Sequence, residues 1–244
     1  MKILRRTLRV LIACIAAAVL AWGLLRGSGL VLFPDQIDPR QWELWGVDVS
    51  SYQGQVDWDL LRRQGVDFAF IKATEGSSLT DPYFSRNWAG ARAAGVLAGA
   101  YHFFSYDSPG ADQAANFLAA APPQAGVLPP VIDVEFYGKY LERPMDPEEA
   151  WPILDELVEA LTAGWGRPPI LYVTARSYRL YIRGRYPDCP LWVSMPMAAP
   201  VWTNWSFWQY SHTARLVGYS GTEGRIDLNV FRGDREALEK LLVG

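Results

Sequence analysis

Two carboxylates, Asp133 and Glu135, stand two residues apart in the short apolar run of residues 129–136. Such a run predicts a buried strand, in which alternate side chains point to the same face. We therefore expect both carboxylates to reach one substrate atom. Because two carboxylates this close cannot both ionise freely, one pKa should rise and leave a proton donor near neutral pH. This chemistry suits glycoside hydrolysis.

An isolated pair of this kind is more often a solvated strand end whose acids cap a loop, so the surrounding elements decide. Strands are expected at residues 44–49, 68–74, 97–104, 129–136, 170–174, 191–194, 206–210 and 225–231. Helices are expected at residues 58–64, 83–94, 111–121, 148–163 and 234–242. Alternating strands and helices imply parallel pairing with right-handed crossovers, and this number of strands favours closure. The prediction is an α/β fold, a TIM-like (β/α) barrel with about eight strands and fewer helices.

Polar residues stand where the expected strands end, which is where the active sites of such barrels gather. Asp48 closes the first strand, Glu75 follows the second, and His102 lies near the end of the third. Asp227 lies on the last strand, which a closed barrel places beside the first. We therefore expect Asp48 and Asp227 to meet across the seam of the barrel.

The start of the chain has the composition of an export segment. Five basic residues and no acid occur before residue 27, and residues 10–25 are uncharged and mostly apolar. A cleaved signal peptide and an uncleaved anchor both fit, and we favour the anchor because the cleavage signal is poor. The expected organisation is a signal anchor or signal peptide with a hydrophobic helix at 1–33, a linker at 34–43 and one catalytic domain at 44–244. In either case the catalytic domain is exported.

Composition excludes several classes of function. The chain has a net charge of −3, and without the five basic residues near its start the remainder carries −8. An acidic body lacks the basic surface that nucleic acids require. Cys14 and Cys189 provide no disulfide within the domain. His102 and His212 lack the spacing of a metal site, so we expect no metal and no cofactor.

Six motifs occur in one order along residues 45–232. They are residues 45–54 (WGVDVSSYQG), 70–76 (FIKATEG), 99–104 (GAYHFF), 133–135 (DVE), 208–210 (WQY) and 226–229 (IDLN). Together they resemble the family 25 glycoside hydrolases, which are lysozymes that act as N-acetylmuramidases. The resemblance implies an irregular barrel with fewer helices than strands. It also implies cleavage of the β-1,4 bond between N-acetylmuramic acid and N-acetylglucosamine in peptidoglycan.

The resemblance implies roles for the four acids as well. Glu135 is expected to be the general acid that protonates the leaving oxygen, with Asp133 as its close partner. Asp48 and Asp227 resemble the remaining acids of the family site, which hold Asp133 and balance charge around the oxocarbenium-like transition state. The nucleophile stays open between the substrate acetamido group and a carboxylate, so the reaction is either substrate-assisted or retaining by direct attack.

Six further residues are candidates for substrate binding: Tyr101, Tyr172, Trp192, Trp208, Glu75 and His102. The four aromatic residues stand where platforms for sugar rings are wanted, although large aromatics in a barrel are as often part of the core. Glu75 could equally form an ion pair with Lys72. His102 is expected to be a hydrogen-bonded residue of the pocket.

Rival interpretations differ in the reaction or in its absence. A chitinase-like or glucosaminidase hydrolase of N-acetylated glycans is the second interpretation. It is not the first because the chitinase motif needs further aspartates before the acidic pair, and residues 128–132 contain none. A catalytically silent cell-wall-binding domain is disfavoured because all four acids are present. The expected partners are peptidoglycan glycan strands, and the membrane through the N-terminal segment. We expect a monomer in the cell envelope, anchored to the membrane or secreted.

Overall fold

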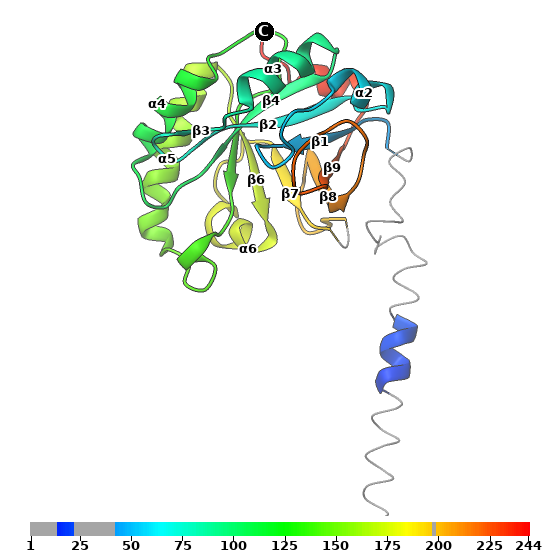
Figure 1. Ribbon diagram of the computed structural model, residues 1–244. Helices are drawn as coiled ribbons and strands as arrows, with labels where there is room; N and C mark the ends of the chain where they lie inside the picture. The colour runs from blue at the N-terminus through cyan, green and yellow to red at the C-terminus, as the bar shows by residue number, and fades with distance from the viewer. Residues whose placement is uncertain (1–13, 22–41, 197–198) are drawn as a thin grey trace, which may run out of the picture.

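Eight strands close into a barrel in the computed structural model, which describes residues 14–21, 42–196 and 199–244 (Figure 1). The strands are β1 (Trp45–Val49), β2 (Phe68–Glu75), β4 (Leu97–Phe103), β5 (Val131–Val134), β6 (Ile170–Thr174), β7 (Leu191–Ser194), β8 (Phe207–Ala214) and β9 (Ile226–Phe231). Their order is β1-β9-β8-β7-β6-β5-β4-β2, and pairing of β1 with β2 closes the ring. A two-residue strand, β3 (Leu79–Thr80), pairs with β2 beyond this ring. The predicted barrel of about eight strands is confirmed.

The last strand departs from the all-parallel pattern. The neighbours from β1 through β2 and β4 to β8 pair in parallel, whereas β9 runs antiparallel to both β8 and β1. A loop at residues 215–225, not a helix, joins β8 to β9, so the expectation of parallel pairing is wrong here. The first residues of β9 therefore lie at the edge of the barrel where the parallel strands end. Asp227 pairs in register with Asp48, which confirms the predicted meeting across the seam.

Helices cover the first half of the barrel and are sparse in the second. The longer ones are α2 (Trp58–Arg63), α3 (Phe84–Ala93), α4 (Gly110–Ala120), α5 (Pro147–Trp165) and α7 (Arg235–Glu239). Short turns of helix, η2 (Gly138–Tyr140), α6 (Ala175–Ser177) and η3 (Tyr178–Ile182), follow β5 and β6. The five longer helices begin and end within three residues of the predicted positions. The described residues between β7 and β9 contain no helix, in agreement with the expected barrel that has fewer helices than strands.

Local signals explain the longest helix, α5. The Asp146 carboxylate caps its start by accepting a hydrogen bond of 3.0 Å from the Glu148 N–H. Pro147 occupies the first turn, where its missing N–H is not needed. Gly166, with φ of 68°, ends the helix in the left-handed conformation that glycine adopts without strain. The sequence around residues 146–166 therefore fixes both ends of the helix.

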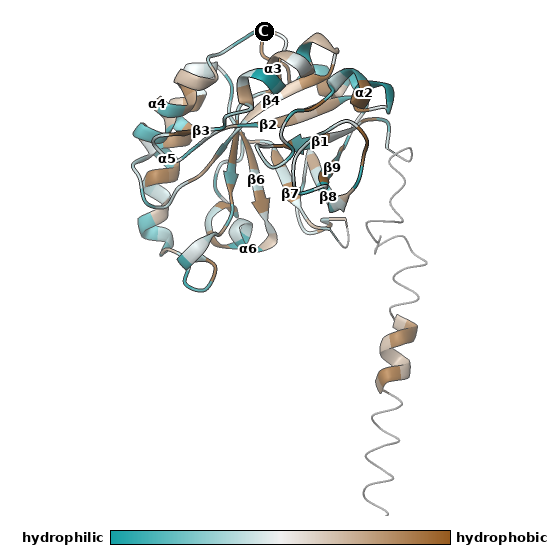
Figure 2. Cartoon of the chain, in the orientation of Figure 1, coloured by the Kyte–Doolittle hydropathy of each residue, from teal (hydrophilic) through white to brown (hydrophobic). Residues whose placement is uncertain are grey.

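Aromatic side chains fill the interior of the barrel. Phe70 stacks on Trp192 with ring centroids 4.3 Å apart, and Phe207 lies 5.0 Å from Phe70 and 5.3 Å from Phe68. Because alternate side chains of a strand share a face, Lys72 follows Phe68 and Phe70 into the interior. Figure 2 shows apolar residues along the strands and both apolar and polar residues on the helices that flank the first half of the barrel. The apolar interior thus becomes polar near the end of β2.

The predicted N-terminal hydrophobic helix is described only in part. Residues 14–21 form a helix on which Ile15, Val19 and Leu20 are exposed, and Figure 2 shows its apolar character. Among the described residues, no helix combines the length and the hydrophobicity that crossing a bilayer requires. The remainder of the predicted segment at 1–33, and the linker except for residues 42 and 43, lie outside the described residues.

We predict that Gly110→Ala destabilises the contact between α4 and α5. A Cβ at Gly110 would overlap the carbonyl oxygen of Ile153 and lie 2.9 Å from the Leu157 nitrogen. Overpacking of this kind costs about 1–3 kcal/mol in the free energy of unfolding, which urea denaturation would measure. Ala111→Ser, at the exposed neighbouring position, should change it by less than about 0.5 kcal/mol. Equal stability of the two variants would contradict the close helix contact.

Candidate active site

A cavity of about 440 Å³ opens at the end of the barrel where the parallel strands finish. Four carboxylates line it: Asp48 from β1, Asp133 from β5, Glu135 directly after β5, and Asp227 from β9. These are the four acids that the sequence predicted for the site. Three of them follow parallel strands to this edge. Asp227 reaches the same edge because β9 is antiparallel and begins there.

Asp48 and Asp227 form a hydrogen-bonded carboxyl pair. Burial raises the pKa of Asp48 to about 6, although hydrogen bonds from Asn229 and Gln209 and the bond with Asp227 work in the opposite direction. Burial, followed by the negative charge of Asp48, raises the pKa of Asp227 to about 9. At neutral pH the pair therefore holds one proton, mainly on Asp227, and one negative charge, mainly on Asp48.

Two buried amides hold this pair in place. Gln209 Nε2 donates to Asp48 Oδ2 at 3.0 Å and to Asp227 Oδ2 at 3.2 Å. Its Oε1 accepts hydrogen bonds from the Tyr172 and Ser194 hydroxyls at 2.9 and 2.8 Å, which fixes the orientation of the amide. A second donor to Asp48 Oδ2, at 2.8 Å, is Asn229 Nδ2. A fully satisfied buried network of this kind is rigid.

Asp133 and Glu135 face the same cavity, as strand alternation predicted. Burial and then the charge of Glu135 raise the pKa of Asp133 well above its ordinary value. Burial and then the charge of Asp48 raise the pKa of Glu135 to about 7, against the opposing charge of Lys72. Both pKa values rise, where the sequence predicted a rise in one. The buried Asp133 Oδ1 has no hydrogen-bond partner in the described part of the chain, so a donor on a ligand would relieve an unfavourable state.

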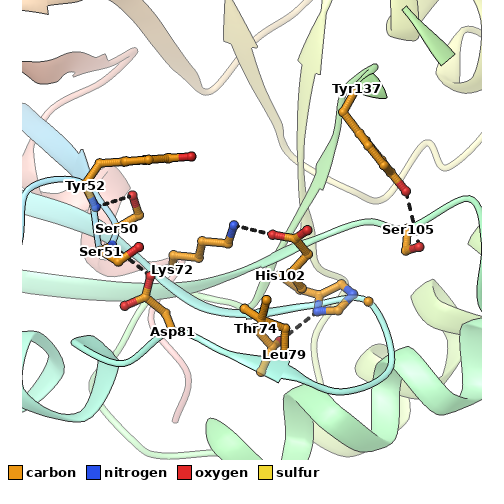
Figure 3. Close-up of polar contacts among 12 residues, drawn as sticks. Ser50, Ser51, Tyr52, Lys72, Thr74, Leu79, Asp81, His102, Ser105 and Tyr137 are labelled. Atoms are coloured by element: carbon orange, nitrogen blue, oxygen red, sulfur yellow. Dashed lines mark hydrogen bonds and ion pairs between the residues drawn. The ribbon is translucent and has the colours of Figure 1, made fainter. Parts of the chain in front are cut away.

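Lys72 supplies positive charge beside the acids. Its Nζ lies 2.7 Å from Glu75 Oε2 and 4.7 Å from the centre of the Phe103 ring, and Figure 3 shows it extended from β2. Lys72 and Phe103 line the cavity, whereas Glu75 does not. Glu75 was a candidate for substrate binding, but its carboxylate is occupied by the ion pair with Lys72. Its geometry fits the alternative that the sequence had left open.

Three of the four predicted aromatic residues, Tyr101, Tyr172 and Trp192, line the cavity. Tyr172 is bound to Gln209, and Trp192 Nε1 donates to Asn229 Oδ1 at 2.8 Å, so both also position the amides. Trp208 lies outside the cavity lining. Because strand side chains alternate, Gln209 faces inward and Trp208 faces outward, where its Nε1 donates to the Met195 carbonyl oxygen at 2.9 Å. Its ring packs against Trp42, Trp205 and Tyr210.

His102 also lies outside the cavity lining, although the sequence had placed it in the pocket. It alternates with Tyr101, faces away from the interior and is fully buried. Its Nε2 donates to Gln113 Oε1 at 3.0 Å. Its Nδ1 accepts from the Thr74 hydroxyl at 2.7 Å, as Figure 3 shows. Burial lowers the pKa of His102 to about 4. A neutral histidine with both ring nitrogens occupied ties β4 to α4.

Sequence reasoning missed several residues of the cavity. Gln209 lines the cavity, and Asn229 holds Asp48 without lining it. Both lie inside quoted motifs, and the two-residue period of β8 and β9 would have placed them on the inner face. Tyr52 lies in another of these motifs and lines the mouth of the cavity. His212 and Arg225 line it too. His212 lies on β8 where the pairing with β9 shifts register, and Arg225 lies in the β8–β9 loop, so the two-residue period of a strand does not place either side chain.

We predict that Asp227→Asn becomes more stable relative to wild type as pH rises. The raised pKa means that the folded chain keeps a proton that the unfolded chain loses near pH 4. The associated stability is complete below about pH 4 and is lost as pH rises toward about 9. Asparagine does not titrate, so the melting temperature of the variant relative to wild type should increase between pH 5 and pH 8. A gain of several degrees is expected, at about 2–4 °C per kcal/mol.

Thermal unfolding followed by circular dichroism at several pH values measures this difference. Asp188→Asn, an exposed site outside the cavity lining, controls for the loss of one charge. A difference between Asp227→Asn and wild type that stays constant from pH 5 to pH 8 would contradict the raised pKa.

Comparison with known proteins agrees with this geometry. The family model "Glycosyl hydrolases family 25" matches residues 47–219. The chain is 35% identical over 214 residues to the uncharacterized protein YegX of Escherichia coli K12, covering 84% of this chain and 76% of that protein. It is 31% identical over 215 residues to lysozyme M1 of Streptomyces globisporus, covering 79% and 69% respectively.

A solved structure has the same fold. The family 25 glycosyl hydrolase from Bacillus anthracis superposes with a TM-score of 0.76 at 44% identity, over 82% of this chain and 94% of that one. The match of the family model covers most of the chain and includes Asp48, Asp133 and Glu135. The chain therefore belongs to glycosyl hydrolase family 25 and is a glycoside hydrolase.

Proposed function

We propose that the chain cleaves the β-1,4 bond between N-acetylmuramic acid and N-acetylglucosamine in peptidoglycan, with Glu135 as general acid and Asp133 as its partner. The observation that carries the proposal is that Glu135, half-buried, lines one cavity with a second carboxyl group, Asp133, where burial raises the pKa of Glu135 to about 7. A general acid works best when its pKa lies close to the working pH. Relatives named lysozyme M1 and N,O-diacetylmuramidase support the choice of bond.

The residues divide the work as follows. Glu135 gives its proton to the glycosidic oxygen as the bond to the anomeric carbon breaks. Asp133, as a carboxylate, either attacks that carbon or orients the acetamido group that attacks it. Both routes place Asp133 beside the anomeric carbon. Asp48 keeps a negative charge near the developing oxocarbenium ion, because Gln209 and Asn229 donate to it.

Three further points extend the proposal beyond the catalytic chemistry. We propose that residues 1–33 direct export, that 34–43 is a linker and that the enzyme works on cell-wall material outside the membrane. Anchoring by the N-terminal segment is the favoured form, with cleavage and secretion as its alternative. We also propose a monomer, because a single chain supplies all four acids of the cavity.

Digestion of purified peptidoglycan tests the substrate. Borohydride reduction of the new ends should yield reduced muramic acid if the proposal is correct. Reduced glucosamine would identify a glucosaminidase instead, and cleavage of chitin in preference to peptidoglycan would identify a chitinase-like hydrolase. Binding to peptidoglycan with no new reducing ends would identify a wall-binding domain without activity. Each of these last three results would overturn the proposal.

We predict that Glu135→Gln abolishes turnover and leaves the fold intact. Glutamine keeps the shape of the side chain and cannot protonate a leaving group, so kcat should fall by about 10²–10⁴ or more. Release of soluble muropeptides measures the rate, and the melting temperature reports the fold. Glu142→Gln, on a surface loop outside the cavity lining, is the matched control and should keep full activity. Residual activity close to wild type in Glu135→Gln would exclude Glu135 as the acid.

We also predict that activity declines on the alkaline side of neutrality. Glu135 acts in its protonated form and its pKa is about 7, so kcat/KM should fall about tenfold per pH unit above about pH 8. Rates on solubilised peptidoglycan strands between pH 4 and pH 10 give the profile. A profile that is flat to pH 9 would show that the proton donor is not a carboxyl group with this pKa.

A further inference from the structure

Tyr52 presents a large aromatic ring to solvent at the mouth of the cavity. It lies in the turn after β1, four residues beyond Asp48, and lines the cavity although the residue is 66% exposed. Figure 3 shows the ring reaching out from this turn alongside Lys72. The four acids lie deeper than this exposed ring. Tyr52 is therefore placed to meet a ligand that extends out of the cavity.

One set of hydrogen bonds, within the turn and to Asp81 directly after β3, makes the turn rigid. The Tyr52 N–H donates to the Ser50 hydroxyl at 3.3 Å, and the Ser51 N–H donates to Asp81 Oδ2 at 2.8 Å (Figure 3). The Ser50 N–H donates to Gln53 Oε1 at 2.9 Å, and the Gln53 N–H returns to the Ser50 carbonyl oxygen at 3.1 Å. The backbone that carries the ring is thus fixed at every residue from 50 to 53.

The β8–β9 loop holds the turn from the other side. The Gly221 N–H donates to the Gln53 carbonyl oxygen at 2.8 Å, and Gln53 Nε2 donates to the Arg225 carbonyl oxygen at 3.1 Å. Gly221 approaches so closely that a Cβ there would overlap the Tyr52 carbonyl oxygen. The β8–β9 loop, more than 160 residues from the turn in sequence, therefore holds the backbone next to Tyr52 in place.

The chemistry of this rim favours an uncharged ligand. Arg225 and Glu223 are both exposed, line the mouth of the cavity and carry opposite charges. These two side chains therefore attract neither an anionic nor a cationic ligand strongly. A rigid tyrosine offers a flat apolar face and a polar hydroxyl at little conformational cost. The face of a pyranose ring, with its C–H groups on one side and hydroxyls at its edge, complements both features.

We propose that Tyr52 is the stacking platform of an outer subsite that binds a neutral N-acetylhexosamine unit, beyond the two sugars that flank the cleaved bond. The inference rests on the proposed action on glycan strands and adds a specificity-determining residue to that same site. It assigns Tyr52 to binding and not to the chemical step. Long glycan strands reach the platform, and fragments that fill only the inner cavity do not.

Steady-state kinetics of Tyr52→Ala, Tyr52→Trp and wild type on long glycan strands and on the shortest cleaved fragment test the proposal. Loss of one aromatic contact should raise KM for long strands about three- to tenfold, with kcat within twofold of wild type. On the shortest fragment Tyr52→Ala should match wild type, and Tyr52→Trp should match it on both substrates. Tyr83→Ala, an exposed tyrosine outside the cavity lining, is the matched control and should change neither constant.

Binding separates this inference from the proposed reaction. Isothermal titration of the Glu135→Gln protein with long glycan strands, with and without Tyr52→Ala, measures the subsite even if no bond is cleaved. A three- to tenfold weaker affinity in the double variant supports the platform. Equal affinity, an equal loss on short and long substrates, or a loss confined to kcat would overturn it. Failure of wild type to cleave glycan, together with weaker binding by the double variant, would overturn the reaction and retain the subsite.

Discussion

Burial of four carboxyl groups around one cavity is the constraint on which the rest of the site depends. Loss of solvation raises the pKa of each, since an ionised carboxylate is poorly stabilised there. Protonation of Asp227, two amide donors to Asp48, and the positive charge of Lys72 offset this cost. The outcome is a cavity that retains protons near neutral pH, which is the condition for general acid catalysis.

The aromatic interior of the barrel determines where the acids lie. Phe70 stacks on Trp192, Trp192 donates to Asn229, and Asn229 donates to Asp48. A continuous path of contacts therefore runs from the packed core to a carboxylate of the cavity. The antiparallel course of β9 completes the arrangement, because it brings Asp227 to the edge where the parallel strands end. Function here depends on the packing of the barrel as much as on the acids.

Much of this fold follows from local pattern, and the exceptions have physical causes. Asp133 and Glu135 could be placed on one face because a strand has a period of two, and Asp48 could be paired with Asp227 because a barrel closes. The direction of β9 could not be predicted, since the apolar pattern of a short strand is the same for parallel and for antiparallel pairing. Parity also explains Trp208 and His102: each is one residue from an inward-facing position, and a motif does not say which of its members faces inward.

Direct titration of the side-chain carboxyl groups tests the central claim. Carbon-13 NMR of protein labelled at aspartate and glutamate carboxyls, followed from pH 3 to pH 10, reports each proton separately. We expect one glutamate to titrate near pH 7 and to vanish in Glu135→Gln, and one aspartate to titrate near pH 9 and to vanish in Asp227→Asn. Titration of all four cavity acids near pH 4, as for exposed carboxyl groups, would contradict the account.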